Sequence, residues 1–124
     1  MPVQTNAKGL KTNVIRLDAK DDEIRRKEAK TMIDLSRLVR ESDFNVSRCI
    51  MAIHDPDVLT FCPTATSRDY AMIEMFGSKN SSEVSFRQKM KMLEGFLIAH
   101  KYKVVTSKIF KKDYPVAKVI VKVQ

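Results

Sequence analysis

The side chains best suited to catalysis lie in the middle of the chain. His54, Asp55 and Asp57 bring an imidazole and two carboxylates close together in sequence, and Cys62 follows soon after. Such groups serve acid–base or metal chemistry. However, the chain has no Cys-x-x-Cys or His-x-x-x-His spacing, and its three glycines are too few for a glycine-rich phosphate loop. We therefore expect no enzyme, no catalytic residue, no cofactor and no metal site.

Binding of a polyanion is the other chemistry that the sequence supports. Residues 84–124 hold ten lysines and arginines but only Glu94 and Asp113 as acids, so this stretch alone carries +8. That value equals the formal net charge of the whole chain, because the bases and acids of residues 1–83 cancel. Positive charge gathered on one stretch is typical of proteins that bind nucleic acid.

The candidate nucleic-acid-binding residues are the polar and basic side chains of this stretch that should face solvent. They are Arg87, Gln88, Lys91, Lys101, Lys103, Lys108, Lys111, Lys112, Lys118 and Lys122. A second basic segment, residues 1–18, contains Lys8, Lys11 and Arg16. It is either a loosely held tail or an arm that follows phosphates, as arms do in several DNA-binding folds.

A helix over residues 85–100 should position the first of these side chains. Ser85 at the N-cap and Gln88 three residues later form a capping box. Apolar residues recur at the spacing of one helical face, namely Phe86, Met90, Leu93 and Leu97. The opposite face carries Arg87, Gln88, Lys91, Met92 and Gly95. We therefore expect a helix that buries one side and presents basic groups on the other.

Two strands should follow this helix. Residues 102–110 are rich in β-branched and aromatic side chains, and residues 116–123 alternate between apolar and other positions. Between them lies the turn-prone segment 111–115, which carries two lysines. In the second strand, Lys118 and Lys122 fall on the face opposite the valines, so we expect both to be exposed.

A long helix should precede the basic region. Asp18 is its expected N-cap, because acids crowd the turn that follows, and residues 19–41 form a helical extension. The first half of this helix is charged on nearly all sides, whereas Met32, Leu35 and Leu38 form an apolar stripe in the second half. We expect the second half to pack in the core. The first half is either solvated or contacts a partner, which can be a second copy of the chain.

Three shorter elements are expected between the two long helices. Residues 44–53 are apolar on several sides, which predicts a buried helix that ends before Pro56. Residues 58–61 fit a short strand. Residues 66–76 begin with a cap-like Thr-Ser-Arg-Asp sequence and then space their large apolar side chains as a short helix does.

From residue 43 to residue 124 the expected order is helix, strand, helix, loop, helix, strand, basic loop, strand. In this order, in the helix-to-strand junction and in the placement of charge, residues 43–124 resemble a winged helix-turn-helix domain. The resemblance implies that residues 85–100 are the recognition helix, which enters the DNA major groove, and that Lys111 and Lys112 form the tip of the wing. One departure is the loop 77–84, which exceeds the about three to four residues of a simple helix-turn-helix.

Cys49 and Cys62 both fall in apolar runs and are expected to be buried free thiols. Two cysteines do not make a disulfide framework, which points to a reducing compartment. No run of about 18 apolar residues is present, so we expect no membrane span. The polar residues 1–18 lack the apolar core of a secretory signal. We therefore expect a cytoplasmic, nucleoid or nuclear protein.

The sequence thus predicts an α+β, mostly helical protein with a basic tail at 1–18, a helical extension at 19–41 and a winged-helix-like domain at 43–124. Its expected function is to bind duplex DNA as a transcription regulator or an accessory replication factor. RNA is a further candidate ligand. The alternative is a small adaptor, inhibitor or assembly subunit, which would bind an acidic protein through its basic face or another protein through its helical N-terminus.

Overall fold

Helix α1 (Leu10–Glu41) is the first element of the chain. The computed structural model describes residues 10–111 and 113–123, and of residues 10–20 it describes the backbone alone. Asp18 lies inside α1, so its prediction as an N-cap is wrong, and residues expected in a tail are helical from Leu10 onward. Lys8 lies outside the described residues, as do the side chains of Lys11 and Arg16.

The chain divides into two units, and α1 contributes to both because the division falls between Thr31 and Met32. In the first unit, the side chains described are mostly exposed, as expected for a helix charged on nearly all sides. Arg25 pairs there with Asp21 at 3.9 Å and with Asp22 at 3.2 Å. Exposed pairs of this kind contribute only about 0.3–0.5 kcal/mol each. A contact of this unit with a partner or a second copy stays a prediction.

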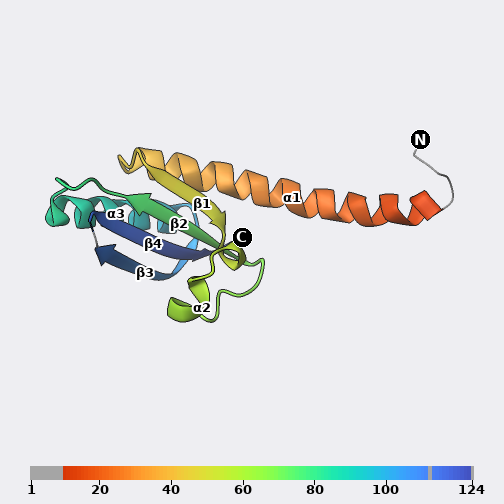
Figure 1. Ribbon diagram of the computed structural model, residues 1–124. Helices are drawn as coiled ribbons and strands as arrows, with labels where there is room; N and C mark the ends of the chain where they lie inside the picture. The colour runs from red at the N-terminus through yellow and green to blue at the C-terminus, as the bar shows by residue number, and fades with distance from the viewer. Residues whose placement is uncertain (1–9, 112, 124) are drawn as a thin grey trace. The chain divides into compact units, whose positions relative to one another are not determined.

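The second unit is built on a four-stranded antiparallel sheet (Figure 1). Its strands are β1 (Ser47–Met51), β2 (Tyr70–Phe76), β3 (Lys103–Lys111) and β4 (Pro115–Lys122). Their order across the sheet is β1-β2-β4-β3, so β1 and β3 form its edges. Because β4 pairs antiparallel with both β2 and β3, these two strands run parallel to each other. Helix α3 (Glu83–Ala99) makes the connection between them.

One face of the sheet, called here the closed face, is covered by α3 and by residues 32–41 of α1. The strands contribute small and branched side chains to this layer, among them Ala71, Ile73, Ala117, Val119 and Val121. The helices contribute Leu35, Leu38, Phe86, Met90, Leu93 and Leu97. Leu35, Leu38, Leu93 and Leu97 have no exposed surface, so this layer is the main core.

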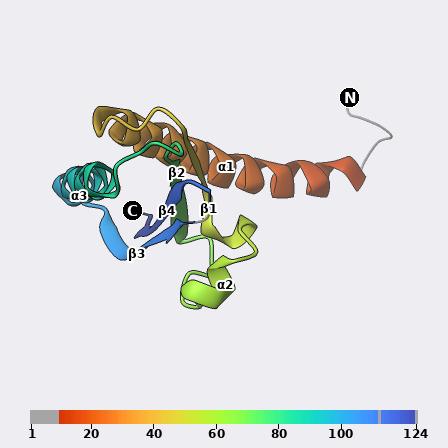
Figure 2. The same cartoon turned by 60° about the vertical axis from the view of Figure 1, so that its left-hand side comes forward.

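The other face, called here the open face, is covered only in part. A short 3₁₀ turn (Ala52–His54) and helix α2 (Val58–Phe61) lie on this side. Figure 2 shows α2 and α3 on opposite sides of the sheet. Beneath α2, a small apolar cluster contains Val58, Cys62, Met72 and Ile120. The rest of the open face includes charged and aromatic side chains, among them Lys108, Phe110 and Lys118.

A hydrogen bond ties the end of α1 to the start of β3 within the second unit. The hydroxyl of Tyr102 donates to Asp34 Oδ2 at 2.8 Å, and Tyr102 is buried. Burial, together with this hydrogen bond to a carboxylate, raises the pKa of Tyr102 to about 12. The same bond holds the pKa of Asp34 below its usual value. Arg37 adds to that effect as a second partner of Asp34.

Three of the expected elements are wrong in type. Residues 47–51 form strand β1 rather than part of a buried helix, and residues 58–61 form helix α2 rather than a strand. Residues 70–76 form strand β2 where a helix was expected. A strand therefore separates α2 from α3, and the expected pair of consecutive helices is replaced by a strand and a helix.

The α+β class is confirmed, and so are a helix over most of residues 85–100 and the two strands that follow it. The prediction of a mostly helical domain overlooked β1 and β2 in the second unit. Both cysteines are free thiols; Cys62 is buried as expected, whereas Cys49 is only half-buried. Burial nevertheless raises the pKa of Cys49. Within the described chain, every helix is too short or too polar to cross a bilayer.

Candidate functional site

Helix α3 has the predicted register but starts earlier than predicted. Its N-cap is Ser82, whose hydroxyl accepts a hydrogen bond from the Ser85 amide at 3.4 Å, so the capping box at Ser85 is wrong. The four apolar residues expected to face inward are all buried, namely Phe86, Met90, Leu93 and Leu97. Gln88 and Lys91 are exposed on the outer side, as expected.

The outer side of α3 is a mixed surface rather than a basic one. Arg87 lies 3.5 Å from Glu83, and Lys89 lies 3.4 Å from Asp43. Three apolar side chains on the same side of the helix are well exposed, with Val84 at 66%, Met92 at 49% and Ile98 at 64%. Such a surface has fewer unpaired cations than the sequence alone suggested.

The β3–β4 turn lies beside the start of α3. Lys111 Nζ is 3.8 Å from Glu83, the same carboxylate that Arg87 approaches. Lys112, the other lysine of the expected wing tip, lies outside the described residues. Lys111 directly follows Phe110 in β3, and neighbouring residues of a strand point to opposite faces. The Lys111 side chain therefore lies on the closed face. It is therefore separated from Lys108 and Lys118.

A row of charged residues crosses the open face. Register places Arg48, Glu74, Lys118 and Lys108 side by side on β1, β2, β4 and β3. Arg48 lies 2.9 Å from Glu74, and the Lys118 ammonium lies 3.6 Å from Glu74. Charge of opposite sign therefore alternates over the first three strands.

Lys118 was expected to be exposed, and this prediction is wrong. Its side chain points to the open face as predicted, but only 8% of the residue is accessible. The ammonium donates to the buried Asp55 at 3.1 Å and also lies 3.6 Å from Asp57. Burial opposes its charge, yet the hydrogen bond to Asp55 and the nearby carboxylates outweigh burial and raise the pKa of Lys118. Lys118 is therefore committed to internal partners.

Lys108, its neighbour on the edge strand, is exposed. Its ammonium lies 5.8 Å from the centre of the Phe61 ring, a favourable cation–π arrangement. Among the described residues, no carboxylate approaches Lys108 within ion-pair distance. The Lys108 ammonium is therefore available to bind an anionic ligand.

A β-bulge adds a second lysine pair to the open face. Lys103 and Lys108 are five positions apart in sequence, so in a regular strand they would point to opposite faces. The register of β3 shifts between Val104 and Thr106, and Lys103 thereby pairs with Lys122 of β4. Both lysines are exposed, and like charges placed directly opposite each other repel. Positive charge is thus concentrated on the β3–β4 half of the open face.

Lys101, the remaining candidate, is exposed at the end of α3. Its φ of 68° lies in the left-handed region, which is usual for the residue that ends a helix and is most often glycine. The backbone amide of the next residue, Tyr102, donates a hydrogen bond to the Leu97 carbonyl and so ends the helix. Lys101 therefore has a role in ending the helix whether or not it binds a ligand.

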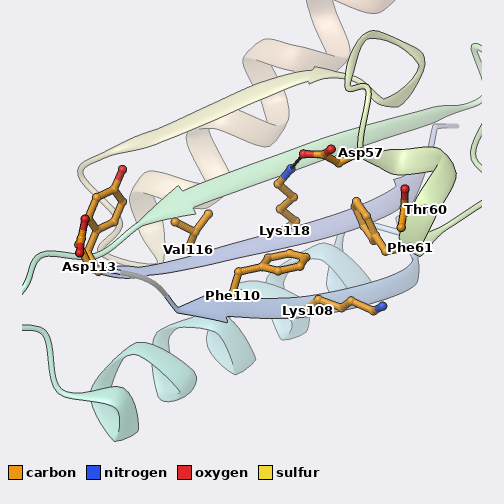
Figure 3. A pocket seen from close by; sticks show the side chains of 9 residues that line it. Asp57, Thr60, Phe61, Lys108, Phe110, Asp113, Val116 and Lys118 are labelled. Atoms are coloured by element: carbon orange, nitrogen blue, oxygen red, sulfur yellow. Dashed lines mark ion pairs between the residues drawn. The ribbon is translucent and has the colours of Figure 1, made fainter.

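A pocket of about 500 Å³ lies on the open face between α2 and the β3–β4 turn (Figure 3). Its lining includes Thr60, Phe61, Lys108, Phe110, Tyr114 and Lys118. Phe61 meets Phe110 edge to face, with ring centres 6.1 Å apart. Phe110 and Tyr114 remain 40% and 42% exposed, so two aromatic rings in the pocket are available to a ligand.

Sequence reasoning missed these aromatic residues. Phe110 is two positions from Lys108 in the strand, so the two side chains point to the same face, and this spacing was visible in the sequence. Phe61 and Asp55 could not be assigned to this site, because they come from a segment whose elements were predicted incorrectly. His54 and His100 do not enter the pocket lining. No group of three metal-ligating side chains occurs among the residues that the structure describes.

The site is thus a partly enclosed aromatic pocket beside exposed lysines, and it lies on a different surface from the predicted recognition helix. Comparisons with protein-family models, with curated proteins and with solved structures found no match for this chain.

Proposed function

We propose that the protein binds nucleic acid through the open face of strands β3 and β4. The observation that carries this proposal is that three exposed lysines, Lys103, Lys108 and Lys122, share a face with the exposed ring of Phe110. Lysines attract the phosphate backbone, and aromatic rings stack on bases. The combination of the two on an open sheet suits a nucleic-acid strand better than it suits a ligand that is merely anionic.

Electrostatics favour the same face. Lys118 is neutralised by its carboxylate partners, and Lys108 has none within ion-pair distance in the described part of the chain. Lys103 and Lys122 repel each other across the strands, so an added phosphate relieves a cost already present in the unbound protein. The net charge of +8 adds a long-range attraction for any polyanion.

The duplex-DNA form of the hypothesis, with α3 as recognition helix, has less support. Arg87 and Lys111 both approach Glu83, and exposed apolar residues interrupt the outer side of the helix. The strand β2 also stands between the two helices that a helix-turn-helix would use. A role in transcription or replication and a location in the cytoplasm, nucleoid or nucleus remain predictions from the sequence.

Charge reversal on the two surfaces tests the proposal. The sheet variant carries Lys103→Glu, Lys108→Glu and Lys122→Glu. The helix variant carries Arg87→Glu and Lys91→Glu together with Lys79→Glu, in the exposed loop that precedes α3, so both variants change net charge equally. We expect the sheet variant to flatten the dependence of log affinity on log salt by roughly two units for random-sequence strands and duplexes. The helix variant should retain most of the wild-type slope.

The opposite pattern, with loss only in the helix variant, would move the binding surface to α3 and contradict the proposal. Wild-type protein that binds neither strands nor duplexes at about 50 mM salt would exclude nucleic acid as the ligand, because phosphate contacts are strongest there. Circular dichroism of both variants checks that each remains folded.

A small interaction protein is the second candidate, and the outer side of α3 favours it. Val84, Met92 and Ile98 are exposed there beside Lys91, a composition suited to a protein partner with apolar and acidic groups. In that case Ile98→Asp should abolish partner capture and leave nucleic-acid affinity unchanged.

A further inference from the structure

The open-face pocket has a polarity along its length. Figure 3 shows Lys108 near Phe61 and Thr60 at one end and Asp113 at the other, with Phe110 and Val116 between them. Lys118 adds little positive charge, because its ammonium lies within 3.6 Å of Asp55, Asp57 and Glu74. The other lining carboxylate, Asp57, is paired with Lys118. Among the residues that the structure describes, the pocket therefore offers one cation without an ion-pair partner, Lys108, at one end and the carboxylate of Asp113 at the other.

This polarity restricts the ligand. An anionic group belongs at Lys108, where the Thr60 hydroxyl is also present. At the opposite end Asp113 repels a second anion, but its carboxylate accepts hydrogen bonds from N–H groups. The middle of the pocket requires a flat apolar body, because the ring of Phe110 is 40% exposed there. A base with one attached phosphate has these three parts in the same order.

The walls of the pocket are held in place before any ligand binds. Phe61 is packed against Phe110 at a ring angle of 75° and lies 5.7 Å from the Lys118 ammonium. Asp55 fixes that ammonium at 3.1 Å and also accepts the amide of Asp57 at 2.7 Å, which anchors the chain that leads into α2. A preformed site loses less conformational entropy on binding than a flexible one.

We infer that this pocket holds one unpaired base of a single-stranded nucleic acid, stacked on Phe110, with the adjoining phosphate on Lys108. The inference rests on the proposed function and deepens it by naming the substrate class. A base inside a duplex is stacked on both sides and cannot enter a pocket bounded by α2 and the β3–β4 turn. Single strands are therefore the preferred ligand, and Lys103 and Lys122 bind phosphates beyond the pocket.

The fluorescence of 2-aminopurine, placed in a short single strand, tests the inference because stacking on an aromatic ring changes its emission. Phe110→Leu keeps an apolar side chain and removes the ring. We expect this variant to weaken single-strand binding by about tenfold or more and to suppress the fluorescence change, with duplex affinity unaltered. Phe96→Leu is the matched control, since Phe96 is partly buried against the closed-face core and lies away from the pocket lining; it should leave the signal intact.

Three outcomes would overturn the inference. Equal loss of strand and duplex affinity in Phe110→Leu would mean that the ring supports the fold rather than a base. No loss in this variant, while Lys103→Glu, Lys108→Glu and Lys122→Glu together still weaken binding, would leave the proposed function standing and remove the pocket from it. Tight binding of a free nucleoside monophosphate, without fluorescence change in the strand, would assign the pocket to a small molecule instead.

Discussion

The two faces of the sheet use the same strands for different purposes. On the closed face, alternate residues of β2 and β4 are apolar, most of them small or branched, and they meet the leucines of α1 and α3 with no exposed surface. On the open face, the intervening residues include Glu74 and Lys118, and the pocket beside them remains accessible. The difference shows that burial alone does not distinguish core from site: Lys118 is as buried as Met90, at 8% exposure, yet it is held by charge.

The two faces also differ in the interactions that stabilise them. Apolar side chains on the closed face are stabilised by removal from water, whereas buried ion pairs lose hydration that their mutual attraction only partly returns. Replacing the row of Arg48, Glu74 and Lys118 by apolar residues would therefore be tolerated in many folds. Its presence here fixes the position of Asp55 and, through Asp57, the start of α2.

The largest effect is expected on the closed face. Leu93→Ala removes a side chain with 0% exposure between α3 and the sheet, and it should lower the free energy of unfolding by about 4 kcal/mol. Lys91→Ala on the outer side of the same helix should change it by less than about 0.5 kcal/mol. Urea denaturation measures both, and similar costs for the two variants would mean that the helical register is wrong.

A smaller effect is expected from breaking the charged row. Lys118→Met leaves Asp55 and Glu74 buried with Arg48 as their remaining cation, and it should cost about 3 kcal/mol at neutral pH. Lys122→Met, two positions along on the same strand but exposed, is the control and should be nearly neutral. A neutral Lys118→Met would mean that the open face tolerates apolar residues as the closed face does.

The smallest effect concerns the hydrogen bond between Tyr102 and Asp34. Tyr102→Phe should cost about 1.5 kcal/mol at neutral pH, because a buried hydroxyl loses its charged acceptor. The pKa of Tyr102 is raised in the folded state from 10.0 to about 12, so its contribution is complete below pH 10 and is lost as pH rises toward 12. Wild type and variant should therefore converge in stability over that range. Tyr114→Phe, which alters an exposed ring, should run parallel to wild type throughout.

The long helix that the sequence predicted correctly has one side facing solvent. Helix α3 shows a clear period because Phe86 and Leu93 are buried while Gln88 and Lys91 are exposed. Strand β2 carries no such contrast, since both of its faces are covered between Ala71 and Met75. A run that is buried on both faces gives no alternation, and a buried helix and a buried strand then look alike.

The candidate site was predicted only in part for a related reason. Lys103, Lys108 and Lys122 were found from charge, and their exposure is confirmed. They lie on one face because of the bulge after Val104, and no glycine or proline near that position predicts a bulge. The neutralisation of Lys118 depends on Asp55, sixty-three positions away in the chain. Neither the spacing of residues nor the local charge can predict contacts between residues so far apart in the chain.

Strand β3 pairs on one side only, so its other side presents unpaired backbone groups to any extended chain. Lys103, Lys108 and Lys111 are spread along this strand, and lysines on an edge discourage the addition of a further strand from another molecule. The same side chains thus limit self-association into ladders of sheets. Variants at these positions should therefore carry glutamate rather than valine, because an uncharged β3 would favour aggregation, and light scattering would then report insoluble assemblies in place of altered affinity.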